Sequence, residues 1–304
     1  MELRRRPSVS IVGAGRLGTA LALTLPIAGY EVKFIAARAG SASRRKAHAL
    51  ARKVGAEVFQ LGGSASLARG RFAATRLDTD IVWIAVPDDS IAQVARDLAG
   101  IHDWDGRFVF HSSGALSSEE LAPLRAKGAK VASVHPMMTF VRGPVPNMGG
   151  VAFAVEGGQL AVRTARKIVA QLGGEAFTIP KQNKVLYHAF GSFTSPLVIA
   201  LMASLEEVAR AAGIGKRDIK RIMLPLLLQT LRNYLHGDAA SAFSGPLVRG
   251  DVATVRKHLE TLKELPEARQ VYISLARAAV KNLPVKNRNK LKQELKRAGD
   301  QERD

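Results

Sequence analysis

Lys184 and His188, near the middle of the chain, are residue types that can transfer a proton or bind an acid, and they lie four residues apart. If this segment is helical, the spacing places both side chains on one face of the helix. Histidine in general ionises near neutral pH and suits general acid catalysis, while a lysine can polarise an oxygen or bind a carboxylate. We therefore assign catalytic roles to Lys184 and His188. The alternative is that Lys184 is solvated and that His188 packs at a junction between domains.

Further polar side chains follow two expected strands, 108–111 and 130–134, at the points where these strands end. Ligands of open parallel sheets bind outside the carboxyl ends of the strands. Ser112 and Ser113 can hydrogen-bond a carboxylate or a carboxamide, and His135 can anchor a substrate or a proton. We therefore expect Ser112, Ser113 and His135 to bind substrate. Alternatively, the serines shape turns that enter helices, and His135 is a buried histidine with satisfied hydrogen bonds.

A loop bounded by glycines, 245–250, precedes an expected helix near the end of the chain. The guanidinium of Arg249, held by such a tight loop, can bind a carboxylate or a phosphate through two hydrogen bonds. Asp251 follows the loop and is most simply the N-cap of the next helix. Arg249 is therefore the residue of this loop that we assign to substrate binding.

The element that must position these groups begins with an apolar strand, 8–12, which leads into a glycine-rich turn and then a helical pattern. Gly13 permits the tight turn, Gly15 lets a pyrophosphate approach the backbone, and Gly18 lets the helix pack close to the strand. The helix N-terminus offers free N–H groups and a partial positive charge to phosphates. A structural corner without a ligand is the alternative. The residues expected to bind a dinucleotide are Gly13, Ala14, Gly15, Arg16, Leu17 and Gly18, with Val86 and Pro87 at the end of the strand 80–86.

The end of the second expected strand, 31–36, distinguishes NAD from NADP. NAD sites place an acid there for the ribose 2′-hydroxyl, whereas a 2′-phosphate requires arginine and hydroxyl groups. No acid follows Glu31 until Glu57, and the intervening segment carries Arg38 and Ser43. Arg38 can stack on the adenine while its charge faces the phosphate. We therefore expect NADP(H), bound in part by Arg38 and Ser43.

Strands alternate with helices as far as residue 179, at a spacing typical of a doubly wound, mainly parallel α/β sheet. After Lys181 the strand signals stop and only helical patterns remain. The sequence therefore predicts an NADP-binding Rossmann domain, an all-α substrate domain and a basic tail that frays or forms a short solvated helix. The expected ranges are 1–180, 181–285 and 286–304.

The composition excludes several classes of function. The 304 residues include no cysteine, which rules out disulfides and thiolate catalysis and fits a reducing cytoplasm. No histidine or carboxylate cluster has the spacing of metal ligands, so we expect no metal. The net charge of +19 is spread along the chain, and aromatic residues are only 6%, which argues against nucleic-acid binding as the main function. No apolar run of membrane-spanning length is expected, nor a signal peptide.

Several motifs make the chain resemble oxidoreductases that join a Rossmann-like domain to a helical C-terminal domain of unknown function, within the 6-phosphogluconate-dehydrogenase-like superfamily. Its characterised relatives are pyrroline-5-carboxylate reductases and deazaflavin-dependent NADP oxidoreductases. The resemblance extends from residue 8 to about residue 283. The motifs are the glycine turn and residues 111–114, 135–140, 184–188 and 245–251.

The resemblance has three implications for the helical half. Lys184 and His188 are similar to the catalytic Lys and Asn of β-hydroxyacid dehydrogenases, with histidine in the second position. The family commonly has a polar residue where this chain has Pro196, which should kink its helix; this leaves Thr194 or Ser195 for that contact, and we assign Ser195 to substrate. The helical domains of relatives often pair, which implies a homodimer in which the loop 245–250 completes the partner's pocket.

Together these observations predict a cytoplasmic, NADP(H)-dependent oxidoreductase. It would transfer hydride to or from a small, anionic carbonyl or imine substrate, which is its expected small-molecule partner. One alternative is a sensor or scaffold that binds NADP(H) without catalysis. Another is an enzyme that passes hydride between a deazaflavin and NADP.

Overall fold

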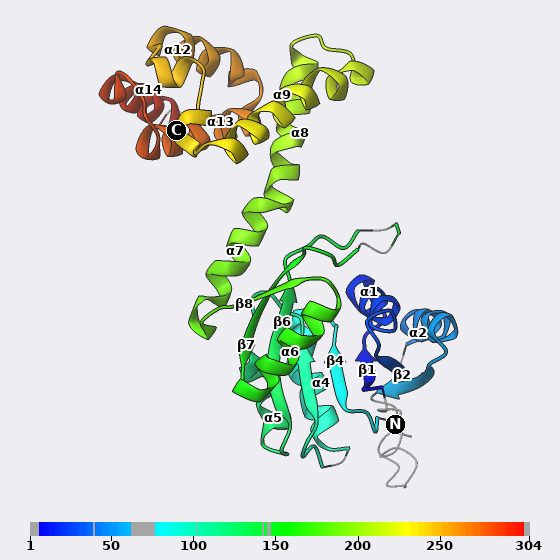
Figure 1. Cartoon of the computed structure of the whole chain (residues 1–304). Coiled ribbons are helices and arrows are strands. Elements are labelled where there is room, and N and C mark those ends of the chain that lie inside the picture. The colour runs from blue at the N-terminus through cyan, green and yellow to red at the C-terminus, as the bar shows by residue number, and fades with distance from the viewer. Residues whose placement is uncertain are drawn as a thin grey trace. The chain divides into compact units, whose positions relative to one another are not determined.

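The computed structural model describes residues 6–38, 40–61, 77–101, 103–141, 143–144 and 147–300. It divides into two compact units, 1–192 and 193–304. The first is a mainly parallel sheet with helices on both faces, and the second is helical (Figure 1). The expected α/β class, with an all-α C-terminal part, is confirmed.

The sheet of the first unit has eight strands in the order β3-β2-β1-β4-β5-β6-β7-β8. All neighbouring strands pair in parallel except β6 and β7, which are antiparallel. From β1 the chain first adds strands on one side of the sheet, β2 and β3, and then on the other side, beginning with β4. Open α/β sheets bind their ligands at this switch point, here between β1 and β4. The strands are β1 (Ser8–Val12), β2 (Glu31–Arg38), β3 (Glu57–Leu61), β4 (Ile81–Ile84), β5 (Phe108–His111), β6 (Lys130–Pro136), β7 (Ala152–Gly157) and β8 (Glu175–Thr178).

Two hydrophobic cores lie on the two faces of this sheet. Helices α1, α2 and α6 supply apolar side chains to one core, and α4, η1 and α5 supply them to the other. The central strands β1 and β4 are buried along their whole length, as expected for apolar strands covered on both faces. The helical segments are α1 (Arg16–Thr24), α2 (Ser41–Val54), α4 (Asp88–Ala99), η1 (Ser118–Leu121), α5 (Ala122–Arg125) and α6 (Gln159–Gln171).

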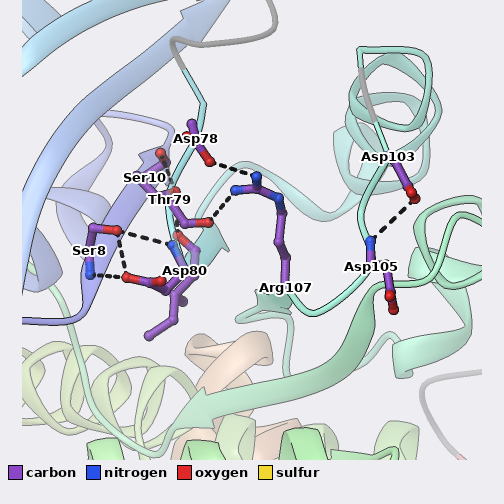
Figure 2. A network of polar contacts seen from close by, with 9 residues as sticks. Ser8, Ser10, Asp78, Thr79, Asp80, Asp103, Asp105 and Arg107 are labelled. Atoms are coloured by element: carbon purple, nitrogen blue, oxygen red, sulfur yellow. Dashed lines mark hydrogen bonds and ion pairs between the residues drawn. The ribbon is translucent and has the colours of Figure 1, made fainter.

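Polar contacts join the amino ends of three strands, at the edge of the sheet opposite the glycine turn (Figure 2). The backbone N–H and the hydroxyl of Ser8 both donate to the Asp80 carboxylate at 2.7 Å. Arg107 donates to the carbonyl of Thr79 at 2.9 Å and to the Asp78 carboxylate at 2.6 Å. These bonds hold the starts of β1, β4 and β5 together and so fix the relative positions of the strands that end near the expected site.

The first unit extends twelve residues beyond the expected division at Pro180. Helix α7 (Lys184–Thr194) follows the short helix η2 (Lys181–Asn183), and it belongs to the first unit as far as Ser192. The reason is that the side chains of Lys184 and Tyr187 bond to groups on the turns and strands of the sheet. Lys184 and His188 are therefore presented by the Rossmann-like unit itself.

The second unit has its own core, formed by α12, α13 and α14. Helix α14 contributes Leu291 and Leu295, which are fully or almost fully buried. The expected basic tail is thus not a frayed or solvated end as far as residue 300, because its leucines recur on one face and pack inward. The helices of this unit are α8 (Pro196–Ala211), α9 (Lys216–His236), α10 (Ala239–Ala242), α11 (Pro246–Arg249), α12 (Val252–Thr261), η3 (Leu262–Glu264), α13 (Pro266–Asn282) and α14 (Arg288–Asp300).

Pro196 interrupts the helical stretch that begins at Lys181. Helix α7 ends at Thr194, and Pro196 occupies the first turn of α8, as expected for a residue that cannot donate a backbone hydrogen bond. Among the described residues, the stretch Lys181–Ala211 is long and apolar enough to cross a membrane by length and composition alone, which differs from the sequence expectation. Only 6% of its most apolar window is buried within the structure.

Candidate functional site

The glycine turn has the geometry that the three glycines were expected to permit. Gly13 has φ +110°, and a Cβ there would lie 2.5 Å from the carbonyl oxygen of Ala85. A Cβ on Gly18 would lie 1.8 Å from the carbonyl oxygen of Gly13. A Cβ on Gly15 would approach nothing closer than the Ala85 oxygen, at 4.0 Å. Gly13 and Gly18 are therefore required by the fold, whereas Gly15 leaves space beside the N-terminus of α1.

That space belongs to a cavity of about 320 Å³ at the carboxyl ends of β1, β2 and β4. It includes six of the ten residues expected to bind the dinucleotide. Its lining residues are Gly13, Ala14, Gly15, Ala37, Ser43, Lys46, Ala85, Val86, Pro87 and Ser90. None of these lining residues is acidic, and Lys46 adds a positive charge, so the cavity suits a phosphate-bearing ligand.

The other four expected cofactor residues lie elsewhere or are only partly described. Arg16 lines a neighbouring hollow of about 580 Å³ and donates to the carbonyl of Phe140 at 3.1 Å. Leu17 packs against the core of the sheet, and Gly18 is buried behind the turn. Arg38 closes β2, but its side chain lies outside the described part of the chain.

The turn after β5 is held by the buried imidazole of His111. Its Nδ1 accepts the backbone N–H of Ser113 at 3.1 Å, so Nε2 carries the proton and donates to the carbonyl of Ser117 at 3.0 Å. Burial, with a smaller contribution from the ammonium of Lys184, lowers the pKa of His111 to about 3. His111 is therefore a neutral residue that fixes the path of residues 112–117. In the sequence, His111 stands out only as part of the motif 111–114.

Ser112 and Ser113 differ in what their hydroxyl groups can still do. Ser112 is half-buried, and its oxygen accepts the indole N–H of Trp83 at 2.8 Å, which leaves its own proton for another acceptor. The hydroxyl of Ser113 donates to the Asp88 carboxylate at 2.8 Å and accepts the backbone N–H of Leu116 at 2.9 Å. Substrate binding by both serines stays a prediction, and the geometry favours Ser112.

His135, at the end of β6, lies beside Tyr187 and His188 of α7. Its Nδ1 is 2.8 Å from the hydroxyl of Tyr187, and its ring is 6.3 Å from that of His188, edge to face. Burial lowers the pKa of His135 to about 4, with a smaller contribution from Lys184, and burial raises the pKa of Tyr187 to about 12. His135 is therefore neutral at pH 7, and Tyr187 keeps its proton.

Gly114 brings the turn after β5 against both histidines. A Cβ on Gly114 would lie 2.7 Å from Cδ2 of His188 and 2.9 Å from Nε2 of His135. His188 is exposed, and its ring makes no hydrogen bond to another described residue, although its backbone carbonyl accepts from Ser192. The structure thus places Gly114 against the rings of His135 and His188, and the shared role of these histidines and Ser112 in substrate binding stays a prediction.

Lys184 is on the same helix as His188, but its side chain is only 1% exposed. Its ammonium donates to the carbonyl of Ser113 at 2.7 Å and to the hydroxyl of Ser133 at 2.6 Å. Burial lowers the pKa of Lys184 to about 8, and the carboxylates of Glu156 and Asp88 partly offset this effect. The expected shared face is present, but Lys184 points into the protein and its catalytic role stays a prediction.

Two expected substrate residues lie in the second unit. Ser195 precedes the first residue of α8, and Arg249 is an exposed residue at the end of α11. Asp251 caps α12, as expected, by accepting the backbone N–H of Thr254 at 3.1 Å and its hydroxyl at 2.7 Å. Among the described residues, no group of three or more His, Asp or Glu could hold a metal ion.

Comparison with known proteins identifies both halves of the chain. Residues 2–136 match the Rossmann-like domain family, and residues 151–279 match a domain of unknown function, DUF2520. The chain therefore consists of a Rossmann-like domain followed by a DUF2520 C-terminal domain, as the resemblance in the sequence implied. A search of curated proteins gave no match.

Solved structures share the fold over nearly the whole chain. A candidate NADP oxidoreductase from Bacteroides fragilis is 20% identical, with a TM-score of 0.69 over 90% of this chain and 97% of that one. A reductive aminase from Aspergillus terreus, in complex with NADPH and ethyl-5-oxohexanoate, is 16% identical, with a TM-score of 0.63 over 94% and 98%. A pyrroline-5-carboxylate reductase from Coxiella burnetii is 16% identical, with a TM-score of 0.53 over 97% and 98%.

Proposed function

We propose that the protein is an NADP(H)-dependent oxidoreductase that transfers hydride to or from a small carbonyl or imine compound. The observation that carries this proposal is the open space at Gly15, beside the N-terminus of α1, in a cavity without acidic lining residues. That arrangement fits a pyrophosphate, because the backbone can be approached closely and the helix end is positively polarised. The oxidoreductases that share the fold support the same class of reaction.

We infer that NADP(H) is preferred to NAD(H). The segment between Glu31 and Glu57 has no carboxylate that would repel a 2′-phosphate. It instead supplies Ser43 and Lys46 to the cavity, and Arg38 at the end of β2. A bound nicotinamide supplies or accepts the hydride, and the residues of this chain must supply the proton and hold the substrate.

His188 is the residue that we assign to proton transfer. Its imidazole is exposed beside Gly114, whereas His135 is neutral at pH 7 and shares Nδ1 with the hydroxyl of Tyr187. A neutral imidazole is a poor acid, so His135 suits orientation of the substrate through Nε2. Ser112 has a hydroxyl proton available for a substrate oxygen or nitrogen.

The proposed anionic character of the substrate rests on Arg249 of the second unit, and Ser195 adds a hydroxyl that can hydrogen-bond a carboxylate. Arg249 ends α11 beside the left-handed residue Gly250, so its backbone is held while its guanidinium remains exposed. A guanidinium held in this way can bind a carboxylate through two hydrogen bonds. We propose Arg249 and Ser195 as substrate-binding residues on that basis.

The test is turnover of NADPH with a panel of cyclic imines, keto acids and ketone–amine mixtures, with a reduced deazaflavin and NADP⁺ as a separate reaction. An oxidoreductase of the proposed kind consumes NADPH with at least one carbonyl or imine compound. Tight NADPH binding without turnover of any compound would favour a sensor. Hydride exchange with the deazaflavin alone would favour the deazaflavin enzyme.

We further propose that the protein is a cytoplasmic homodimer formed through α8 and α9. Helix α8 has no buried residue, and the only buried residue of α9 is Ile219. A soluble chain rarely exposes so continuous an apolar surface, and a second copy offers an equal one across a two-fold axis. The exposed apolar side chains on these helices are Leu197, Val198, Ile199, Ile222, Leu224, Leu226, Leu228, Leu231, Tyr234 and Leu235.

A further inference from the structure

We propose that Lys184 is a positioning residue that fixes the turn after β5 and does not transfer a proton. The inference rests on the proposed function, because the turn in question carries Ser112 and Gly114 of the proposed substrate site. It departs from the sequence expectation, in which Lys184 acts on the substrate. The Lys184 side chain points into the first unit, a direction that its spacing with His188 does not determine.

The ammonium of Lys184 joins three elements of the first unit. From α7 it donates to the carbonyl of Ser113, after β5, at 2.7 Å, and to the hydroxyl of Ser133, on β6, at 2.6 Å. The hydroxyl of Ser133 in turn donates to the same Ser113 carbonyl at 3.3 Å. Hydrogen bonds from a charged donor are among the stronger bonds in proteins, so the ammonium holds this carbonyl firmly.

The carbonyl that Lys184 holds lies between the two residues that face the proposed substrate. Ser112, on one side, has its oxygen bonded to Trp83 at 2.8 Å. Gly114, on the other side, leaves no room for a Cβ beside the rings of His135 and His188. Because Ser113 connects them, a displaced Ser113 carbonyl moves Ser112 and Gly114 together. Lys184 can therefore act on the reaction without touching the substrate.

Burial and charge also favour this role. At 1% exposure, the Lys184 side chain cannot meet a ligand unless α7 moves. The carboxylates of Glu156 and Asp88 raise the pKa of Lys184 and so favour its charged form. Glu156 is itself buried and held by the backbone N–H and the hydroxyl of Ser118, at 2.6 and 2.9 Å. A buried charge is tolerated only when it is paired and hydrogen-bonded. Lys184 meets this condition through its bonds to Ser113 and Ser133, so it can serve as an anchor for the turn.

The first test measures access to the amine in the wild-type protein. Reductive methylation with formaldehyde and cyanoborohydride, read by mass spectrometry, is compared at Lys184 and at the exposed Lys181, with and without NADPH. The proposal predicts that Lys184 is methylated at least ~10-fold more slowly than Lys181 in both states, because its amine is buried and bonded. Methylation of Lys184 at the rate of Lys181, with protection by NADPH, would overturn the proposal.

The turn after β5 lies at the carboxyl edge of the sheet, where a bound nicotinamide would meet the substrate, so the second test separates the two ends of the cofactor. In Lys184→Met, NADPH affinity should fall by ~10-fold, while affinity for 2′,5′-ADP, which lacks the nicotinamide half, should change by less than ~2-fold. Ser133→Ala should shift NADPH affinity in the same direction by a smaller factor, and the control Lys181→Met should shift neither. Unchanged NADPH binding in Lys184→Met, or an equal loss for both ligands, would contradict the proposal.

A third readout needs no cofactor, so it remains valid if the proposed function fails. The ammonium of Lys184 contributes to the low pKa of His135 and of His111. An NMR titration of the imidazoles should therefore find a higher pKa for His135 in Lys184→Met than in the wild type, while Lys181→Met leaves it in place. If the pKa of His135 is the same in Lys184→Met and in the wild type, Lys184 does not occupy the position that the inference requires. If the wild type fails to bind NADPH while this shift is found, only the proposed function is refuted.

Discussion

At the scale of single residues, three histidines near the carboxyl edge of the sheet differ in their surroundings. His111 is buried and bonded at both ring nitrogens, and His135 is bonded at one nitrogen to Tyr187. His188 is exposed, and its ring makes no hydrogen bond to another described residue. One histidine, His111, thus fixes a turn, whereas we propose that His135 orients a ligand and that His188 supplies a proton. The same residue type has different roles because burial and bonding differ.

Replacement of His188 tests the assignment of proton transfer. His188→Ala should lower kcat by ~10²- to 10⁴-fold, because general acid catalysis contributes by about that factor. NADPH affinity should stay within ~2-fold of wild type, since the proposed role of His188 is in the chemical step and not in cofactor binding. Steady-state kinetics and NADPH fluorescence titration measure the two quantities. The control His258→Ala changes a histidine of the second unit that bonds to Tyr272, and it should leave both values near wild type.

Two glycines of the first turn should respond oppositely to substitution. Gly15 has φ −75° and open space, so Gly15→Val should keep the free energy of unfolding within ~0.5 kcal/mol yet weaken NADPH binding by at least ~10-fold. Gly18→Ala should destabilise the protein by about 2 kcal/mol or more, because its Cβ would collide with the Gly13 carbonyl. Urea denaturation and NADPH titration check both variants. Normal NADPH binding by Gly15→Val would show that the turn is not part of the cofactor site.

The places of the candidate residues in the fold could be predicted from sequence, because glycine and the ends of strands have strong positional meaning. Ser112 and His135 lie where β5 and β6 end, and the ring of His188 on α7 is 6.3 Å from that of His135. The partners Tyr187, Ser133 and Glu156 could not be predicted, since each acts across elements far apart in the chain. The inward direction of Lys184 also could not be predicted, because helical spacing fixes a shared face but not what covers it.

At the scale of elements, the turn between β5 and η1 depends on a histidine that must remain neutral. Burial holds the pKa of His111 near 3 and that of His135 near 4, whereas the unfolded chain takes up protons at about pH 6.5. Both groups therefore contribute stability that is complete above pH 6.5 and is lost as the pH falls toward their folded values. The upper part of this range, from pH 6.5 to 5, lies above the pH at which ordinary carboxylates of the unfolded chain titrate.

The free energy of unfolding should therefore decline as the pH falls from 6.5 to 5. Each neutral histidine adds a slope that approaches about 1.4 kcal/mol per pH unit once the unfolded state is protonated. Urea denaturation at a series of pH values measures the slope. His135→Asn should remove the part of this slope that His135 contributes. A free energy that is constant between pH 6.5 and 5 would show that the two imidazoles are charged in the folded protein.

The succession of elements was predictable because apolar strands, caps and glycine stops recur at regular spacing. Strands such as β1 and β5 begin and end where the sequence indicated. The end of the first unit was less predictable. A change from strands to helices marks Pro180, but α7 belongs with the sheet because of bonds made by Lys184 and Tyr187.

At the scale of the whole molecule, the second unit has a packed core at α12–α14 and an exposed apolar surface on α8 and α9. The sequence shows that these two helices are apolar but not what covers them. The proposed dimer accounts for this surface with a second copy of the chain. It also accounts for a long apolar stretch, Lys181–Ala211, in a chain with a net charge of +19.

The dimer is tested by two leucines on α9, Leu226 and Leu235, which are 72% and 77% exposed in the single chain. Wild type should have twice the 32.6 kDa mass of the chain by light scattering, and Leu226→Lys with Leu235→Lys should reduce it to the monomer mass. Leu160→Lys, which changes an exposed leucine of α6, is the matched control. A monomeric wild type, or one that partitions into neutral lipid vesicles through these leucines, would contradict the dimer.

The most direct test of the central claim is a fluorescence titration of the wild-type protein with NADPH and NADH under identical conditions. The acid-free segment between Glu31 and Glu57, together with the open turn at Gly15, predicts that NADPH binds at least ~10-fold more tightly than NADH. Tighter binding of NADH would contradict the choice of cofactor. Failure of both dinucleotides to bind would contradict the account as a whole.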